Sequence, residues 1–302
     1  MQPNLITILG PTAVGKTRLA AKLAAKFGGE IISADSRQVY VGMNIGTGKD
    51  LFDYSVGDKN VEYHLIDIVT PEEEFNLYEF TKQFFICYSK IIDKGKISFL
   101  VGGTGLYLSS ILQNYKLNKV NENQNRLDEL SNLNHSELIE ILIALNPSLH
   151  NSTDLVDKER TIRAIIVAES NQEKAQNKIE INSLNIGITA DREIIKKRIT
   201  ERLKRRLKEG MIEEVDSLMK SGISKEKLDF FGLEYRYVSK YLSGEFNYND
   251  MYQKLNSSIH AFAKRQMTWF RKMEKEGVKI NWINYDDHES AEKIIEQNNF
   301  IL

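Results

Sequence analysis

The chain has 302 residues, of which 41 are Lys or Arg and 42 are Asp or Glu, so its formal net charge is −1. That length allows one large core with a smaller second domain, and the balanced charge does not by itself predict a polyanionic partner. The single cysteine, Cys87, excludes an internal disulfide and a cysteine-based zinc site. Because the sequence has neither a signal-peptide pattern at its start nor an apolar run of about 20 residues, we expect a cytoplasmic protein without membrane segments.

The first third of the chain alternates strand-like and helix-like patterns. Apolar strand patterns cover 4–9, 30–34, 63–68 and 97–101, and helical spacing covers 17–27 and 77–93. This alternation predicts an α/β fold with an open, mostly parallel sheet flanked by helices. Ligands of such sheets bind beyond the carboxyl ends of the strands, which is where "GPTAVGKT", "DSRQ" and "GGTG" stand in the sequence.

The composition changes near Asn114. From there to Asn182 the chain is rich in Asn, Glu, Lys and Leu and contains no glycine, with helical patterns at 126–130, 136–145 and 157–168. We therefore predict a small all-helical insertion at 114–183 that interrupts a core formed by 1–113 and 184–302. A disordered linker is the alternative interpretation for 114–125. A strand pattern at 185–189 resumes the core.

One or two long helices are predicted over 191–220, with an interruption at Gly210. This segment is strongly basic, with Lys196, Lys197, Arg198, Arg202, Lys204, Arg205, Arg206 and Lys208. Helical spacing places Arg198, Arg202 and either Arg205 or Arg206 on one face. That face is either a solvated helix surface or a source of arginines for a phosphate site.

The stretch "GPTAVGKT" matches the P-loop pattern G-x-x-x-x-G-K-[ST] and lies between a predicted strand and a predicted helix. The phosphate-binding residues are Gly10, Pro11, Thr12, Ala13, Val14, Gly15, Lys16 and Thr17. Backbone N–H groups of such a loop form an anion nest, and the positive end of the following helix adds to it. Lys16 supplies a charge to the outer phosphate, and the Thr17 hydroxyl can bind Mg²⁺. The fold class is therefore P-loop NTPase-like, although the loop does not identify the phosphorylated compound.

Two neighbouring motifs bear on that question. Asp35 ends a strand beside the P-loop, where it could act as a base, direct magnesium or cap a turn. In "VGGTGLY" the glycines allow close backbone approach, and Thr104 offers a hydroxyl. The strand before this motif does not end in the aspartate of a usual Walker B element. His64, like the other histidines, lacks metal-ligand spacing, and we interpret it as structural.

Together the motifs resemble one family, the tRNA dimethylallyltransferases (tRNA A37 isopentenyltransferases). The resemblance rests on "GPTAVGKT" at 10–17, "ISADSRQVYVGMNIGTGKD" at 32–50, "YHLID" at 63–67, "VGGTGLYL" at 101–108, "ERTIRA" at 159–164, "ADREIIKKRITERL" at 190–203, "GLEYR" at 232–236 and "AKRQMTWFR" at 263–271. These motifs follow the family order over nearly the whole chain. Asn44, Asp50 and Glu234 depart from the family pattern, which has Asp, Pro and Gly at those positions.

The resemblance implies that the P-loop, from Thr12 to Thr17, binds dimethylallyl diphosphate with Mg²⁺ on Thr17. The dimethylallyl group would move to N6 of adenosine 37 beside the tRNA anticodon. Asp35 would accept the N6 proton, with Lys16, Thr17, Thr104 and Arg202 completing the catalytic set. The insertion would grip the anticodon stem-loop, and the protein would act as a monomer. The residues facing the tRNA would be Asp35, Ser36, Arg37, Gln38, Thr104, Arg126, Glu159, Arg160, Thr161, Ile162, Arg163, Phe231, Gly232, Leu233, Glu234, Tyr235 and Arg236.

Two other classes of function fit the residues without the resemblance. A small-molecule or nucleoside kinase would use the P-loop for ATP, Asp35 as a base and the basic helix as a lid. A non-catalytic RNA-binding P-loop switch is the third interpretation. Lys264, Arg265, Arg271 and Lys272, next to Trp269, belong to a helix that either contacts RNA or joins domains, and Trp269 itself is equally suited to the core.

Overall fold

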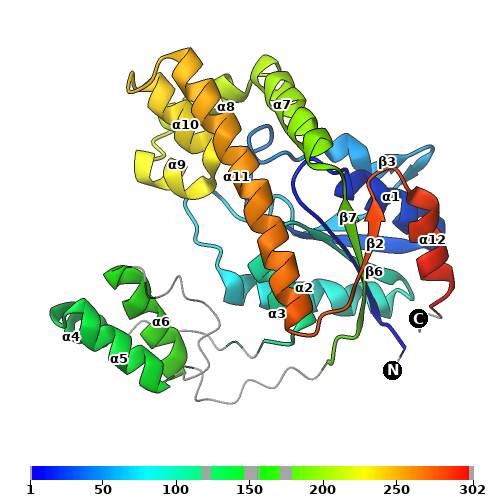
Figure 1. Cartoon of the computed structure of the whole chain (residues 1–302), viewed down its shortest axis with the longest axis horizontal. Coiled ribbons are helices and arrows are strands. Elements are labelled where there is room, and N and C mark those ends of the chain that lie inside the picture. The colour runs from blue at the N-terminus through cyan, green and yellow to red at the C-terminus, as the bar shows by residue number, and fades with distance from the viewer. Residues whose placement is uncertain are drawn as a thin grey trace. The chain divides into compact units, whose positions relative to one another are not determined.

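The structure is a computed structural model that describes residues 2–115, 117, 124–145, 155, 157–170 and 179–298 (Figure 1). The chain forms two compact units, one of Met1–Asn114 with Ile181–Leu302 and one of Tyr115–Glu180. The alternative of a disordered linker at 114–125 concerns a segment that falls mostly outside the described residues. Among the described helices, none combines the length and apolar character needed to cross a membrane.

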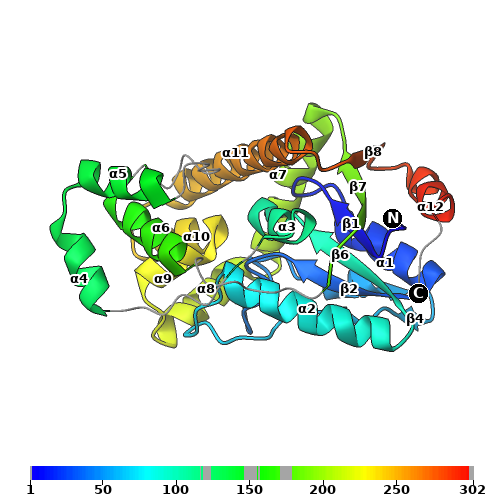
Figure 2. The same cartoon turned by 90° about the horizontal axis from the view of Figure 1, so that it is seen from below.

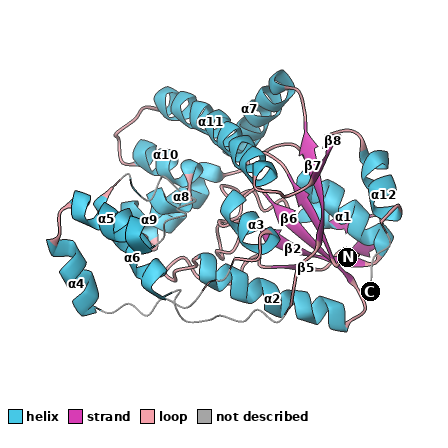
Figure 3. Cartoon of the chain, turned by 60° about the horizontal axis from the view of Figure 1, so that its bottom comes forward, coloured by secondary structure: helices cyan, strands magenta, loops and turns pink. Residues whose placement is uncertain are grey.

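The first unit is an α/β core, in which six strands form the main sheet (Figure 3) and β3 and β4 form a separate antiparallel pair. Its elements are β1 (Leu5–Leu9), α1 (Lys16–Phe27), β2 (Gly29–Ala34), the 3₁₀ helix η1 (Leu51–Tyr54), β3 (Ser55–Val56), β4 (Lys59–Asn60), β5 (Tyr63–His64), α2 (Leu77–Asp93), β6 (Ile97–Gly102), α3 (Gly105–Leu112), β7 (Ser183–Thr189), α7 (Arg192–Lys208), α8 (Met211–Lys220), α9 (Lys225–Phe231), α10 (Leu233–Leu242), α11 (Tyr248–Lys275), β8 (Ile280–Asn284) and α12 (His288–Glu296). The main sheet has the order β5-β2-β6-β1-β7-β8, and all its neighbouring strands are parallel. This arrangement confirms the predicted fold class.

The centre of the sheet is buried on both faces, because β1 is apolar or β-branched throughout and all five of its residues are buried. Ile6 and Ile8 pack with α1 and with Ala291 of α12. Alternate residues of a strand point to opposite faces, so buried Leu5 and Leu9 point to the face opposite that of Ile6 and Ile8. Helices α3 and α1 lie on opposite sides of β6 (Figure 2). Long buried apolar runs of this kind need helices on both sides, and the sequence provides them.

Two strands differ from the sequence-based expectation. The third strand was predicted over 63–68, but the structure limits β5 to Tyr63–His64. Leu65 and Asp67 have φ values of 61° and 53°, and this left-handed backbone cannot continue a strand. The prediction also lacked β8, the edge strand that pairs with β7 from Asn185 to Thr189.

The register of the sheet brings three loops to one edge. Leu9 and Ala34 both lie beside Gly102, so β1, β2 and β6 end at the same level. Consequently the P-loop, the "DSRQ" segment and the "GGTG" segment begin side by side. The predicted clustering of these motifs at the carboxyl ends of the strands is present.

The second unit contains three described helices, α4 (Gln124–Asn132), α5 (His135–Leu145) and α6 (Lys158–Ser170). Their buried side chains form a separate small core of Leu130, Leu138, Leu142, Ile162 and Ile165. The apolar residues of α5 and α6 recur with helical spacing, which gives each helix one face for this core.

Candidate active site

The P-loop runs from the end of β1 into α1. Gly10 (φ 156°), Ala13 (φ 67°) and Gly15 (φ 88°) bend the backbone around the loop. A Cβ on Gly10 would lie 2.5 Å from the carbonyl oxygen of Ile188 on β7, so the loop fits against β7 only as glycine. No side chain caps the first turn of α1, which leaves its N–H groups to a ligand.

Lys16 lies within this loop and is half-buried. Its Nζ donates a hydrogen bond to the carbonyl oxygen of Pro11 at 2.7 Å. Burial, followed by the nearby charge of Arg202, lowers the pKa of Lys16 to about 7, while the Asp35 carboxylate acts in the opposite direction. No carboxylate of the described residues forms an ion pair with this amine, as expected for a group that binds a phosphate.

Two arginines of α7 reach across to the P-loop. Arg198 Nε donates to the carbonyl oxygen of Ala13 at 2.7 Å, and Arg202 Nη2 donates to Thr12 Oγ1 at 2.6 Å. Burial and the neighbouring Arg206 lower the pKa of Arg202 to about 9. Two arginines of this helix face therefore contact the P-loop, so the face is not solely a solvated surface.

The third member of this face is Arg206, which is 3% exposed. Its Nη2 lies 3.5 Å from Asp50 Oδ2, and a Cβ on Gly48 would collide with the guanidinium. Arg205 is more exposed and lies 3.6 Å from Asp50 Oδ1. The "NIGTGKD" loop therefore packs directly against the basic helix, and Asp50 supplies the carboxylate that Arg205 and Arg206 share.

Asp35 follows β2 and turns back onto its own segment. Its Oδ1 accepts the N–H of Arg37 at 2.9 Å. Ser36 lies between Asp35 and Arg37, and its backbone N–H donates to Thr104 Oγ1 at 3.1 Å. This bond joins the "DSRQ" and "GGTG" loops. The Asp35 carboxylate opposes the lowering of the Lys16 pKa, so the predicted base lies close enough to act on the predicted phosphate-binding cation.

Gln266 of α11 links the loops, and the sequence reasoning did not single it out. Its Oε1 accepts the N–H of Thr12 at 2.8 Å, and its Nε2 donates to the Gly103 carbonyl at 2.9 Å. A Cβ on Gly103 would lie 2.4 Å from Nε2, and one on Gly105 would collide with Trp269. The glycines of "GGTG" therefore allow α11 to approach, and half-buried Trp269 packs there as a structural residue.

Glu214 of α8 is a second residue that sequence reasoning missed. Its carboxylate accepts three consecutive backbone N–H groups, from Asn44 (2.8 Å), Ile45 (2.7 Å) and Gly46 (3.0 Å). It also accepts the hydroxyl of buried Tyr235 at 2.7 Å. These bonds fix the "NIGTGKD" loop, whose Gly48 carbonyl in turn accepts a bond from Gln38. The only sequence signal was an unremarkable glutamate in the first turn of a helix.

The segment 231–236 contributes buried support as well as accessible groups. Phe231 and Tyr235 are each 1% exposed, and Phe231 packs edge-on against Tyr40. Burial raises the pKa of half-buried Glu234, against the influence of Arg206 and Arg202. Gly232, with a φ of 134°, makes the turn between α9 and α10; Leu233 and Arg236 are half-buried, and Arg236 Nη2 donates to the Asp229 carbonyl at 3.0 Å.

The remaining predicted RNA-facing residues belong to the second unit. Arg126 pairs with Glu169 and Glu129, and these bonds raise its pKa. Thr161 and Ile162 are buried in the core of the unit, whereas Glu159, Arg160 and Arg163 are exposed on α6.

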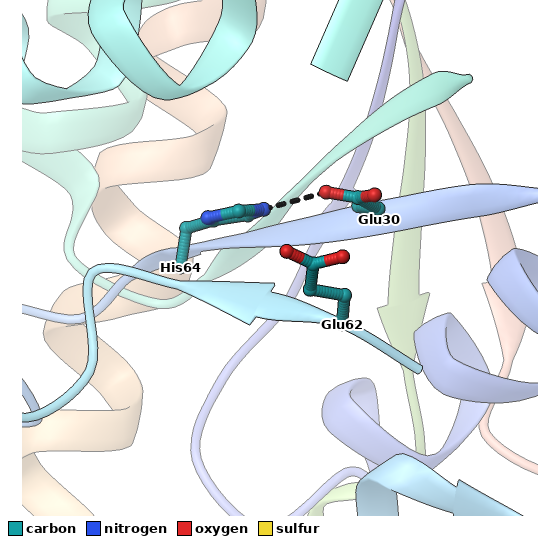
Figure 4. Close-up of side chains that lie close together, drawn as sticks. All are labelled: Glu30, Glu62 and His64. Atoms are coloured by element: carbon teal, nitrogen blue, oxygen red, sulfur yellow. Dashed lines mark hydrogen bonds and ion pairs between the residues drawn. The ribbon is translucent and has the colours of Figure 1, made fainter. Parts of the chain in front are cut away.

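A separate polar cluster lies near the start of β2 and β5, at the other end of β2 from Asp35 (Figure 4). Glu30, Glu62 and His64 bring their side-chain ligand atoms within 4.8 Å of one another. Lys94 Nζ binds both carboxylates at 2.9–3.1 Å, and Lys96 Nζ binds Glu30 at 2.7 Å. Because two ammonium groups already neutralise the carboxylates, the cluster is an ion-pair network with His64 at its edge rather than a metal centre.

Comparison with known proteins places this geometry in context. A family model described as IPP transferase matches residues 38–273, and one described as isopentenyl transferase matches residues 3–59. The tRNA dimethylallyltransferase 1 of Geotalea uraniireducens is 51% identical over 287 residues, covering 95% of this chain and 94% of that protein.

Solved structures agree with the sequence comparison. The full-length tRNA isopentenylpyrophosphate transferase of Bacillus halodurans has a TM-score of 0.70 and 30% identity, with 99% of this chain and 95% of that chain covered. A eukaryotic dimethylallyltransferase, solved acting on tRNA, has a TM-score of 0.73 and 21% identity, with 98% of this chain and 77% of that chain covered. The second likeness bears on the fold alone.

Proposed function

Because the chain belongs to the tRNA dimethylallyltransferase (IPP transferase) family, we propose that it transfers a dimethylallyl group from dimethylallyl diphosphate to N6 of adenosine 37 in tRNA. The observation that carries the proposal has two parts. The first is a P-loop that Arg202 contacts at Thr12. The second is the hydrogen bond from Ser36 to Thr104, which joins the "DSRQ" and "GGTG" loops. A kinase needs the first part alone. The second part provides a place for an acceptor beside Asp35, and family membership supports prenyl transfer over phosphoryl transfer.

The reaction breaks the allylic C–O bond and forms a bond from N6 to the allylic carbon. Diphosphate leaves with the electron pair of the C–O bond, so negative charge grows where the P-loop N–H groups, Lys16 and Arg202 are placed to stabilise it. The N6 lone pair supplies the electrons of the new bond. Asp35 orients the amine and accepts its proton, and positioning the weak nucleophile against the carbon supplies a large part of the rate.

We propose that Thr17 binds Mg²⁺ together with oxygens of the diphosphate. The Thr17 hydroxyl lies in the first turn of α1, and among the described residues it has no hydrogen-bond partner, so it is free to bind a cation. Magnesium usually keeps several waters and binds through few protein ligands plus substrate phosphates, which matches a single hydroxyl here. When bound, the ion supplies charge that stabilises the leaving diphosphate.

The same proposal assigns the tRNA to the surface around Asp35. The target base must leave the stack of the anticodon loop before its N6 can reach a carboxylate that ends a buried strand. Arg37 and Gln38 continue from Asp35, and the exposed Glu159, Arg160 and Arg163 of α6 offer charged groups for the anticodon stem-loop. Buried members of the predicted set, such as Phe231 and Tyr235, would support these contacts from within.

A transfer assay tests the proposal. The protein is incubated with radiolabelled dimethylallyl diphosphate, Mg²⁺ and unmodified tRNA, next to the same tRNA with guanosine in place of adenosine 37. We expect label in the first tRNA alone. Absence of label in both, together with steady hydrolysis of ATP or transfer of its phosphate to a nucleoside, would overturn prenyl transfer in favour of the kinase.

A further inference from the structure

Phe230 and Arg37 form a cation–π pair in which the ring is exposed and the arginine, two residues after Asp35, is half-buried. Phe230, near the end of α9, is 50% exposed, although Leu228 and Phe231 of the same short helix are buried. The guanidinium carbon of Arg37 lies 4.5 Å from the centroid of the Phe230 ring. A large aromatic ring is thus presented to solvent with a planar cation on one side.

The guanidinium of Arg37 has no acceptor among the residues that the structure describes. Within the described part of the chain its N–H groups make no hydrogen bond and no ion pair, even though the side chain is half-buried. Burial lowers the pKa of Arg37, which means that the charged form is poorly solvated where it stands. Five donors in a partly desolvated position are suited to a ligand that brings acceptor atoms.

Both partners are held in place. The backbone N–H of Arg37 donates to Asp35 Oδ1 at 2.9 Å, so the backbone from which the guanidinium extends is fixed beside the predicted base. The ring of the next residue, Phe231, lies edge-on to Phe230 at 5.9 Å between centroids, and it packs in turn on buried Tyr40 at 4.8 Å. A flat surface that is already rigid loses little conformational entropy when a second flat group stacks on it.

We propose that the Phe230–Arg37 pair is a stacking platform for the unpaired base next to the target adenosine in the substrate RNA. The proposal rests on the proposed function and adds a residue, Phe230, and a role to it. Arg37 is two residues after Asp35 in the chain, so a base extruded to Asp35 brings its neighbouring nucleotide close to Arg37. Aromatic rings and guanidinium planes are the groups on which proteins stack unpaired bases, and the free N–H groups can reach a phosphate or a base oxygen.

Three variants test the platform by steady-state kinetics with an anticodon stem-loop RNA. Phe230→Leu removes the ring and keeps apolar volume, Phe230→Tyr keeps the ring, and Phe52→Leu removes a ring that is 68% exposed on η1 as the matched control. We expect Phe230→Leu to raise the KM for RNA about tenfold, as loss of one stacked base does, while the KM for dimethylallyl diphosphate stays within about twofold. Phe230→Tyr and Phe52→Leu should resemble the parent protein.

Abasic substitutions in the RNA identify the stacked base. An abasic site is placed at the nucleotide before adenosine 37 in one RNA and after it in another. The parent protein should lose about tenfold in RNA affinity with one of them, and Phe230→Leu should lose no more with that RNA, because the contact is already gone. Losses that add, an unchanged RNA KM in Phe230→Leu, or an equal rise in the KM for the donor would each overturn the platform.

The two proposals fail separately. If the parent protein transfers no label, the proposed function fails, and the platform is then tested by direct titration of the same RNAs against the same variants. If the parent protein labels adenosine 37 and Phe230→Leu behaves identically, the platform alone fails.

Discussion

Gln266 and Thr12, which are 254 residues apart in the chain, are joined by a hydrogen bond of 2.8 Å from the Thr12 N–H to the Gln266 amide oxygen. The other end of the same amide donates to the Gly103 carbonyl. One buried side chain of α11 therefore fixes the distance between the phosphate loop and the loop that carries Thr104. Both loops line the edge of the sheet where transfer is proposed.

The first prediction concerns this bridge. Gln266→Leu keeps the volume but leaves a buried N–H and a buried carbonyl without partners, which costs about 1–3 kcal/mol per group. We expect the KM for dimethylallyl diphosphate to rise about tenfold, together with a lower melting temperature. Gln253→Leu, at an exposed position of the same helix, is the control and should change neither. An unaltered KM in Gln266→Leu would show that the P-loop holds its shape without α11.

The second prediction separates chemistry from binding at Asp35. Asp35→Asn keeps the oxygen that accepts the Arg37 N–H, so the turn should persist, but the amide cannot take a proton. We expect kcat to fall by about 10²-fold or more, since general base catalysis contributes that much, and the Kd for dimethylallyl diphosphate to stay within twofold. Rapid-quench kinetics and calorimetry measure the two. A variant with near-normal kcat would remove Asp35 from the role of base.

The third prediction follows from the pKa of Lys16, which burial lowers to about 7. Below pH 7 the free protein carries the ammonium, and above pH 7 it loses it, whereas a bound diphosphate favours the charged form. Binding above pH 7 must therefore take up a proton, and affinity should fall between pH 7 and 8.5 by up to tenfold per pH unit. Calorimetry in buffers of different ionisation enthalpy detects the proton. Lys16→Arg, which stays charged, should bind without this uptake; proton-neutral binding by the parent at pH 8 would contradict the prediction.

The fourth prediction tests Glu214 as the anchor of the loop at 44–46. Glu214→Gln keeps the shape but turns an acceptor oxygen into a donor that faces backbone N–H groups. We expect the free energy of unfolding to fall by about 2 kcal/mol, as for loss of hydrogen bonds to a charged group. Glu213→Gln, one residue earlier and exposed, is the matched control for denaturant titration. Equal stability of the two variants would mean that the loop is held by other contacts.

The fifth prediction concerns acid stability at Glu30. Burial opposes ionisation of this carboxyl, but hydrogen bonds from Lys96, Lys94 and His64 outweigh it and lower the pKa to about 2. A lowered folded-state pKa stabilises the fold above the unfolded value of 4.5, and that stabilisation is lost as the pH falls from 4.5 towards 2. Glu30→Gln should therefore be less stable at pH 7 and show a flatter decline over this window. Glu292→Gln, in a surface pair with Lys26, is the control; the same decline in all three proteins would exclude Glu30 as its source.

The sequence was sufficient to predict those features of the fold that a short stretch of residues encodes. The P-loop, the buried strand before Asp35 and the helix at Leu77–Asp93 each show their period or spacing within a short window, and the structure has them at those places. The strand predicted at 63–68 was too long, because the left-handed residues Leu65 and Asp67 carry no glycine signal. Edge strand β8 is short and partly exposed, so its alternation is weak.

The site could be predicted only in part, because its supports are long-range contacts. Glu214 meets Asn44 across 170 residues, and nothing in a short window distinguishes it from the exposed Glu213 beside it. The basic face of α7 was ambiguous for the same reason. Only the fold reveals that Arg198 and Arg202 end on the P-loop whereas Lys197 and Lys204 face solvent.

The chain leaves and re-enters the α/β core at a single point. The backbone N–H of Ile181 donates to the Asn114 side chain at 3.4 Å, and that of Asn182 donates to the Asn4 side chain at 2.9 Å, directly before β1. The whole helical unit is thus attached through two adjacent ends, with its own apolar core. The unit can therefore be exchanged as a whole. A short turn or the corresponding unit of a relative could take its place, and the sheet that carries the P-loop would still form.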